Sequence, residues 1–235
     1  MPATFPHLTA FPMAMALMTR RSFPIPVLGL VHIRNEITQS RPFAADARLD
    51  FRVWIEPPRT HPKGVAFDVC AQAWDTETAT DGNPPWTSIS TYLRRMPAPP
   101  SLPPQQDLAR QPNAPTLSPA ATDLWQLPSS LGRRYASVSG DRNPIHLHPW
   151  TARAFGFPRA IAHGMWTKAR CLAALTATSK PPEGLPAAFR IQVDFRAPVL
   201  LPSQVSFSAE TASRRFAVRS PDGLREHLVG ELTVL

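Results

Sequence analysis

Cysteine is scarce in this sequence. The two cysteines, Cys70 and Cys171, lie far apart and show no metal-ligand spacing. A small scaffold held by several disulfides and a cysteine-ligated metal site are therefore excluded. We interpret both residues as buried thiols of a reduced, cytoplasmic protein.

Long hydrophobic runs are also missing. The apolar stretches are short and are broken by proline, glycine or charge, so no membrane-spanning segment is expected. The opening stretch, "MPATFPHLTAFPMAMALMTRR", lacks a basic start, and Pro6 and Pro12 interrupt its apolar run, which is not typical of a signal peptide. Hydrophobic residues still make up 43% of the chain, enough for a sizeable core.

Acidic residues are fewer than basic ones. The chain has 17 Asp and Glu and 25 Lys and Arg, which gives a formal charge of +8. Such a balance suits a polyanionic partner, such as nucleic acid or the phosphates of coenzyme A. The basic residues are scattered in pairs such as Arg133-Arg134, without a long run or a nucleic-acid-binding motif, so we expect no nucleic-acid partner. Solubility alone is the other explanation of the charge.

Proline is abundant, with 29 residues, and it clusters in "MPAPPSLPPQQDLARQPNAPTLSP" at 96–119. This composition predicts an extended linker rather than a helix or a packed strand. The chain is thereby divided into a first half at 1–95, a linker at 96–120 and a second half at 121–235.

The two halves resemble each other in pattern. Each predicts a helix, at 12–21 and 164–179, followed by a strand, a break that contains proline, and further strands. When Pro42 is aligned with Pro198, Ile37 falls on Val193 and Phe51 on Phe207. Apolar residues alternate along these strands, which indicates one buried face. The sequence therefore predicts an α+β protein in which two antiparallel sheets, each wrapped around a central helix, lie side by side.

The stretch "SGDRNPIH" at 139–146 contains the candidate catalytic residues. Pro144 fixes its own φ and disfavours helix at Asn143, so a rigid irregular loop is expected. Such a loop can aim Asp141 and His146 at one water, whereas His148 is expected to face the other way. A polar surface turn is the alternative interpretation. Gly164, in the first turn of the second predicted helix, offers a backbone N–H at the positive end of the helix dipole.

Residues 135–169, "YASVSGDRNPIHLHPWTARAFGFPRAIAHGMWTKA", closely resemble the signature of the MaoC-like dehydratases, which are hot-dog-fold (R)-specific enoyl-CoA hydratases. The repeat and the linker suit the double hot-dog members of that family. The resemblance implies that Asp141 and His146 are the catalytic pair and that the Gly164 amide is the oxyanion donor. It also implies supporting roles for Ser139, Asn143, Pro144 and His163.

The implied reaction is the reversible hydration of a trans-2-enoyl thioester to the (R)-3-hydroxyacyl thioester. No metal or separate cofactor is expected, because coenzyme A or acyl carrier protein forms part of the substrate. The family also allows a homodimer. Two other functions remain open, a hot-dog thioesterase and a non-catalytic acyl-CoA-binding protein, since the fold alone excludes neither.

The first half departs from the family pattern. It has no counterpart of the Asp141 to His146 loop, and Pro12-Met13 stands where the second half has His163-Gly164. We therefore expect a degenerate first hot-dog without a leading strand and loop, either because this is a shortened family member or because the true start lies upstream. The first half can then form a wall of the pocket for the acyl tail. Its expected flexible lining residues are Met13, Met15 and Met18. Ordinary core packing is the alternative for these methionines.

Overall fold

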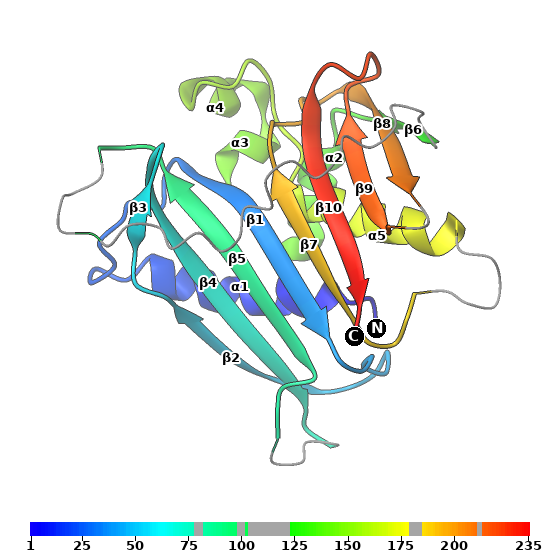
Figure 1. Ribbon diagram of the computed structural model, residues 1–235. Helices are drawn as coiled ribbons and strands as arrows, with labels where there is room; N and C mark the ends of the chain where they lie inside the picture. Colours follow the sequence, from blue (N-terminus) through cyan, green and yellow to red (C-terminus); the bar gives the residue numbers. More distant parts are fainter. Residues whose placement is uncertain (78–81, 98–101, 103–122, 179–184, 211–212) are drawn as a thin grey trace.

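The strands of the chain form one antiparallel sheet in this computed structural model (Figure 1), in the order β2-β4-β5-β1-β7-β10-β9-β8-β6, with β3 paired to β4. The structure describes residues 1–77, 82–97, 102, 123–178, 185–210 and 213–235. The predicted linker at 96–120 lies almost wholly outside the described residues. The strands are β1 (Leu30–Gln39), β2 (Leu49–Ile55), β3 (Arg59–His61), β4 (Gly64–Asp75), β5 (Trp86–Arg94), β6 (Asp123–Leu127), β7 (Phe189–Phe195), β8 (Ser203–Glu210), β9 (Arg215–Arg219) and β10 (Glu226–Val234).

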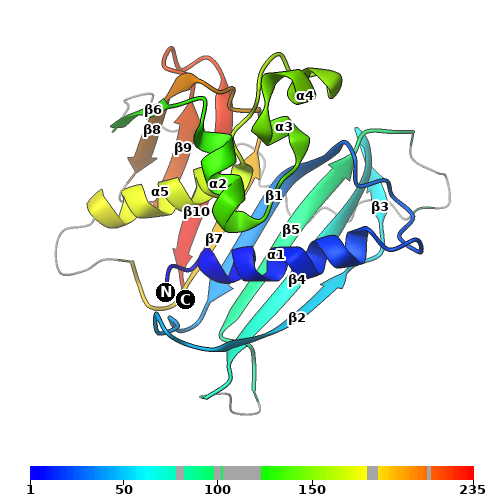
Figure 2. The same ribbon diagram turned by 180° about the vertical axis from the view of Figure 1, so that it is seen from behind.

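Helix α1 (Phe5–Met18) crosses the face of the first-half strands, as Figure 2 shows. Its buried residues include Ala10 and Ala14, whose small side chains let the helix lie close to the sheet. The predicted start at residue 12 is wrong. Pro6 occupies the first turn, where a missing N–H costs nothing, and Pro12 is accommodated inside the helix.

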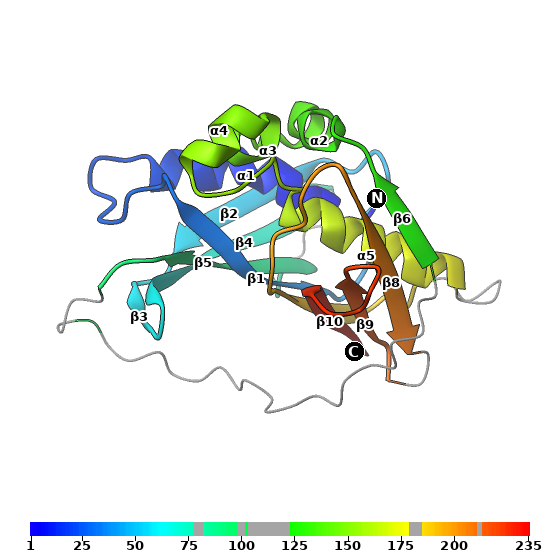
Figure 3. The same cartoon turned by 90° about the horizontal axis from the view of Figure 1, so that it is seen from above.

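The second half repeats the first. Helix α5 (Gly164–Thr178) takes the place of α1, and the order β7-β10-β9-β8 repeats β1-β5-β4-β2. The alignment of Pro42 with Pro198 therefore pairs equivalent strands. Strand β6 extends the second half beyond β8, whereas no described strand lies beyond β2. The helices lie together on one side of the sheet (Figure 3).

Strands β1 and β7 join the halves. They pair from Arg34 with Asp194 to Gln39 with Phe189, and Ile37 and Ile191 at the centre are fully buried. The two sheets are therefore one continuous sheet, and the predicted double hot-dog fold is confirmed.

The buried side chain of Lys168, on α5, forms hydrogen bonds to both strands of this junction. Its ammonium nitrogen donates to Asn35 Oδ1 at 2.5 Å, to Asn35 O at 3.3 Å and to Ile191 O at 3.0 Å. The side chain has no exposed surface, and burial lowers the pKa of Lys168 well below its ordinary value. One side chain thus connects helix α5 to both strands of the junction, β1 and β7.

We expect limited proteolysis to cut first between about residues 96 and 120, because the proline-rich composition predicts few packed contacts there. The two fragments should nevertheless co-elute in size-exclusion chromatography, since β1 pairs with β7 along six residue pairs. Separation of the nicked halves without denaturant would contradict the shared sheet.

Both cysteines are buried, as predicted. Among the described residues, no helix is both long enough and apolar enough to cross a membrane.

Candidate active site

The Asp141 loop begins where helix α2 (Leu131–Ser139) ends. Gly140 ends the helix with a φ of +72°, which a residue with a side chain adopts reluctantly. The Asp141 N–H then donates to Ser139 Oγ at 3.2 Å, and the Asn143 N–H donates to Asp141 Oδ1 at 3.1 Å. The loop therefore holds the carboxylate by its own short-range hydrogen bonds.

Asn143 and Pro144 start the short helix α3 (Pro144–Leu147). Asn143 Oδ1 accepts from the Ile145 N–H at 3.4 Å, and Pro144 takes the first helical position, where its missing N–H costs nothing. The expected irregular loop is thus wrong for 144–147, which are helical. His148 caps the next helix, α4 (Pro149–Ala154), by accepting from the Trp150 N–H.

His146 is buried, and its tautomer follows from its contacts. Nδ1 lies 2.8 Å from Ile161 O, and the Ile161 N–H donates back to Ile145 O at 3.1 Å. Because a carbonyl only accepts, Nδ1 carries the hydrogen and Nε2 carries the lone pair. Burial lowers the pKa of His146, although the Asp141 carboxylate and the bond to Ile161 act in the opposite direction.

His163 supports this pair. Its ring stacks on His146 with a centroid separation of 3.7 Å, and Nε2 donates to Asp141 O at 3.0 Å. Burial lowers the pKa of His163 to about 3, so its 3.8 Å approach to Asp141 Oδ2 is no ion pair at neutral pH. The hydrogen bond from His163 Nε2 to Asp141 O therefore holds the backbone of the Asp141 loop in place.

Gly164 is the first residue of α5 and directly follows His163. A Cβ at this position would lie 2.9 Å from Cε1 and 3.0 Å from Cζ of Phe195. Only glycine therefore fits without displacing this ring. Its N–H belongs to the first helical turn, whose amides have no partner within the helix.

Asp141, His146 and His163 offer donor atoms that all lie within 4.8 Å of one another. By that measure they could hold a metal ion. Each imidazole uses one nitrogen on a backbone carbonyl and keeps its other nitrogen for a ligand. The absence of a metal from the reaction remains a prediction.

Three residues near this site were given no role in the sequence analysis, although Tyr135 opens the stretch that resembles the family signature. A Cβ on Gly132 would lie 1.9 Å from His146 O, so this glycine lets α2 pack against α3. Tyr135 lies 4.8 Å from His163 between ring centroids. Tyr92 comes from the first half, and burial and the Asp141 charge raise the pKa of both tyrosines. Of the three, Gly132 could have been noticed from the sequence, because a glycine inside a helical pattern often has a packing reason.

Known proteins share this architecture. A family profile described as the MaoC like domain matches residues 104–223. The 3-hydroxyacyl-thioester dehydratase X of Mycobacterium tuberculosis is 37% identical over 206 residues, which cover 86% of this chain and 67% of that protein.

Solved structures agree with the family match. A crystal structure of HtdX from Mycobacterium tuberculosis superposes with a TM-score of 0.80 at 30% identity, over 100% of this chain and 87% of that one. An acyl-ACP thioesterase from Bacteroides thetaiotaomicron shares the fold alone, with a TM-score of 0.59 at 13% identity, over 97% of this chain and 88% of that one. By its profile match and its long alignment with a dehydratase, the chain belongs to the MaoC-like dehydratase family.

Proposed function

We propose that this chain is a hydro-lyase that hydrates trans-2-enoyl thioesters reversibly to (R)-3-hydroxyacyl thioesters in acyl metabolism. The observation that carries the proposal is the placement of Asp141 and His146 on one braced segment beside the start of α5. Coenzyme A or acyl carrier protein enters as part of the substrate, and no separate cofactor is required.

The reaction needs a water aimed at Cβ, a proton for Cα and stabilisation of the enolate oxygen. The Asp141 carboxylate and His146 Nε2 can hold one water between them. The hydroxyl of that water bonds to Cβ, the pair takes up one proton, and the pair returns one proton to Cα. The Gly164 N–H, at the positive end of the α5 dipole, stabilises the thioester oxygen.

The two other functions have less support. A thioesterase directs water at the carbonyl carbon, whereas the segment from Asp141 to His146 has the residues that hydration at Cβ requires. A purely binding protein has no need for a buried imidazole with a free lone pair beside a carboxylate.

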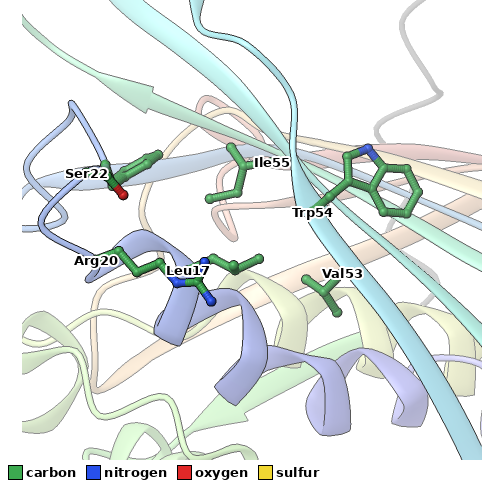
Figure 4. Close-up of a pocket in the computed structure, with 7 residues that line it drawn as sticks. Leu17, Arg20, Ser22, Val53, Trp54 and Ile55 are labelled. Atoms are coloured by element: carbon green, nitrogen blue, oxygen red, sulfur yellow. The ribbon is translucent and has the colours of Figure 1, made fainter.

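The acyl tail is proposed to enter the first half. A crevice of about 10 Å³ beneath α1 is lined by Tyr92, Ala14 and Val53, and it must widen to admit a tail. Val53 also lines a wider, open hollow of about 280 Å³ at the end of α1, with Leu17 and Ile55 (Figure 4). Tyr92 stacks on His32, which lies 4.9 Å from Phe195 between ring centroids, and Phe195 packs against Gly164. On this geometry we place the inner end of the crevice near the proposed reacting carbons.

The methionines expected along this path do not line it. Met13 is exposed, and Met18 is buried in the core with Phe67 and Val69. Neither the crevice nor the open hollow has a methionine among its lining residues. The lining instead consists of aliphatic and aromatic residues, with polar residues both in the crevice and, as Arg20 and Ser22, in the open hollow.

We expect kcat/KM to rise from a four-carbon enoyl-CoA to one of about eight carbons, because each buried methylene adds about 0.8 kcal/mol of binding. The product should be the (R)-3-hydroxyacyl thioester. A chain-length series with chiral analysis of the product tests both expectations. A sharp preference for crotonyl-CoA would exclude the acyl path, and an (S) product would overturn the proposed function.

On the acidic side of its pH profile, kcat/KM should fall to half its maximum at a pH below 6.5, the ordinary pKa of histidine. His146 can accept a proton only when it is neutral, and burial lowers its pKa, so the neutral form persists to a lower pH. Measurement of kcat/KM between pH 5 and 8 checks this. Half-maximal activity above pH 6.5 would show that His146 is not the titrating base.

A further inference from the structure

His32 brings a first-half side chain to the edge of the active site. The pairing of β1 with β5 shifts register between His32 and Arg34, and such a bulge redirects the side chains beside it. The His32 ring stacks on Tyr92 with a centroid separation of 4.7 Å and lies 4.9 Å from Phe195. Phe195 is the ring against which Gly164 is packed. His32 is therefore one ring away from the proposed oxyanion donor.

The buried Nε2 of His32 has no hydrogen-bond partner among the described residues. Burial, assisted by His7 and Lys168, lowers the pKa of His32, so the ring is neutral. A buried polar atom without a partner is costly, and a ligand that supplies the partner removes this cost.

Tyr92 supplies the complementary group. Its hydroxyl makes no hydrogen bond with the described residues, and burial raises its pKa, so it remains a neutral donor. His7, Ser88 and Ser90 also line the crevice, but they are hydrogen-bonded to one another or to Asn35. An unsubstituted hydrocarbon tail would satisfy neither His32 Nε2 nor the Tyr92 hydroxyl, whereas convergent polar groups in an otherwise apolar pocket orient a ligand.

We propose that His32 and Tyr92 form a subsite for a hydroxyl group carried by the acyl chain beyond the reacting carbons. A hydroxyl can donate to His32 Nε2 and accept from the Tyr92 hydroxyl at the same time. This second oxygen is distinct from the 3-hydroxyl, which Asp141 and His146 handle. The inference rests on the proposed function and specifies its substrate class as oxygenated acyl thioesters.

The direct test compares trans-2-octenoyl-CoA with analogues that carry a hydroxyl at carbon five, six or seven. In the wild-type protein, at least one analogue should exceed the unsubstituted substrate in kcat/KM by about fivefold to tenfold, the effect of one or two net hydrogen bonds. The gain should appear mainly in KM. Equal or lower values for all three analogues would overturn the subsite. Failure to hydrate any of the four substrates would overturn the proposed function as well.

Two variants assign the effect to its residues. His32→Phe and Tyr92→Phe keep an aromatic ring in the stack and remove only the polar atom. Each should abolish most of the preference for the hydroxylated substrate, measured as the ratio of its kcat/KM to that of octenoyl-CoA in the same variant. Tyr135→Phe is the matched control, because it removes a hydroxyl near Asp141 from the second half and should keep the preference. A preference that persists in both first-half variants would contradict the assignment.

Discussion

Asp141→Asn and His146→Ala should each lower kcat/KM for enoyl-CoA hydration by about 100-fold or more, the scale of a lost acid–base group. The first change removes the carboxylate charge and keeps the side-chain shape. The second removes the imidazole whose Nδ1 is bound to Ile161 O. Both act on the same water, so the double variant should lose less than the product of the two single losses. Steady-state hydration kinetics of the three variants measure these effects.

His148→Ala is the matched control for this pair. His148 lies two residues beyond His146, but it caps α4 and is exposed. Its loss should cost about 1 kcal/mol of stability and leave hydration within a few-fold of wild type. Near-normal activity in a folded Asp141 or His146 variant would remove the basis of the proposed mechanism.

Gly164→Ala should lower kcat by about 100-fold, the usual cost of one oxyanion donor. The added methyl group would lie 2.9 Å from the Phe195 ring. That ring is confined by its contact with His32 at 4.9 Å, so the start of α5 must shift and carry the amide with it. Steady-state kinetics should show the loss mainly in kcat, because the amide acts on charge that develops during the reaction.

A second substitution separates displacement of the amide from general damage. Phe195→Leu in the Gly164→Ala background makes room for the methyl group and should restore part of the lost rate. Phe195→Leu alone supplies the baseline. Full activity of Gly164→Ala, with no change in the crystal position of the amide, would show that this N–H is not the oxyanion donor.

Local patterns predicted most of the fold. Alternating apolar residues indicated the strands that form β7 and β8, and the alignment of Pro42 with Pro198 matched equivalent strands of the two halves. The start of α1 was mispredicted, because Pro6 and Pro12 look like helix breakers although the first turn tolerates one and the helix accommodates the other. The prediction of a linker falls on residues that the structure does not describe.

The candidate site was predictable only where its residues are close in sequence. Asp141, Asn143 and His146 stand within one motif, and the structure places them on one braced segment. His32 and Tyr92 lie more than forty residues earlier in the chain. They approach the site only because β1 pairs with β7, and this long-range contact leaves no local signal in the sequence.

One assay addresses the central claim, that the chain adds water across the double bond of an enoyl thioester. Wild-type protein is mixed with trans-2-octenoyl-CoA, and enoyl absorbance and free thiol are followed together. We predict a loss of enoyl absorbance with no release of thiol, and no absorbance loss with Asp141→Asn on the same time scale. Release of free thiol in step with substrate loss would instead identify a thioesterase and contradict the account.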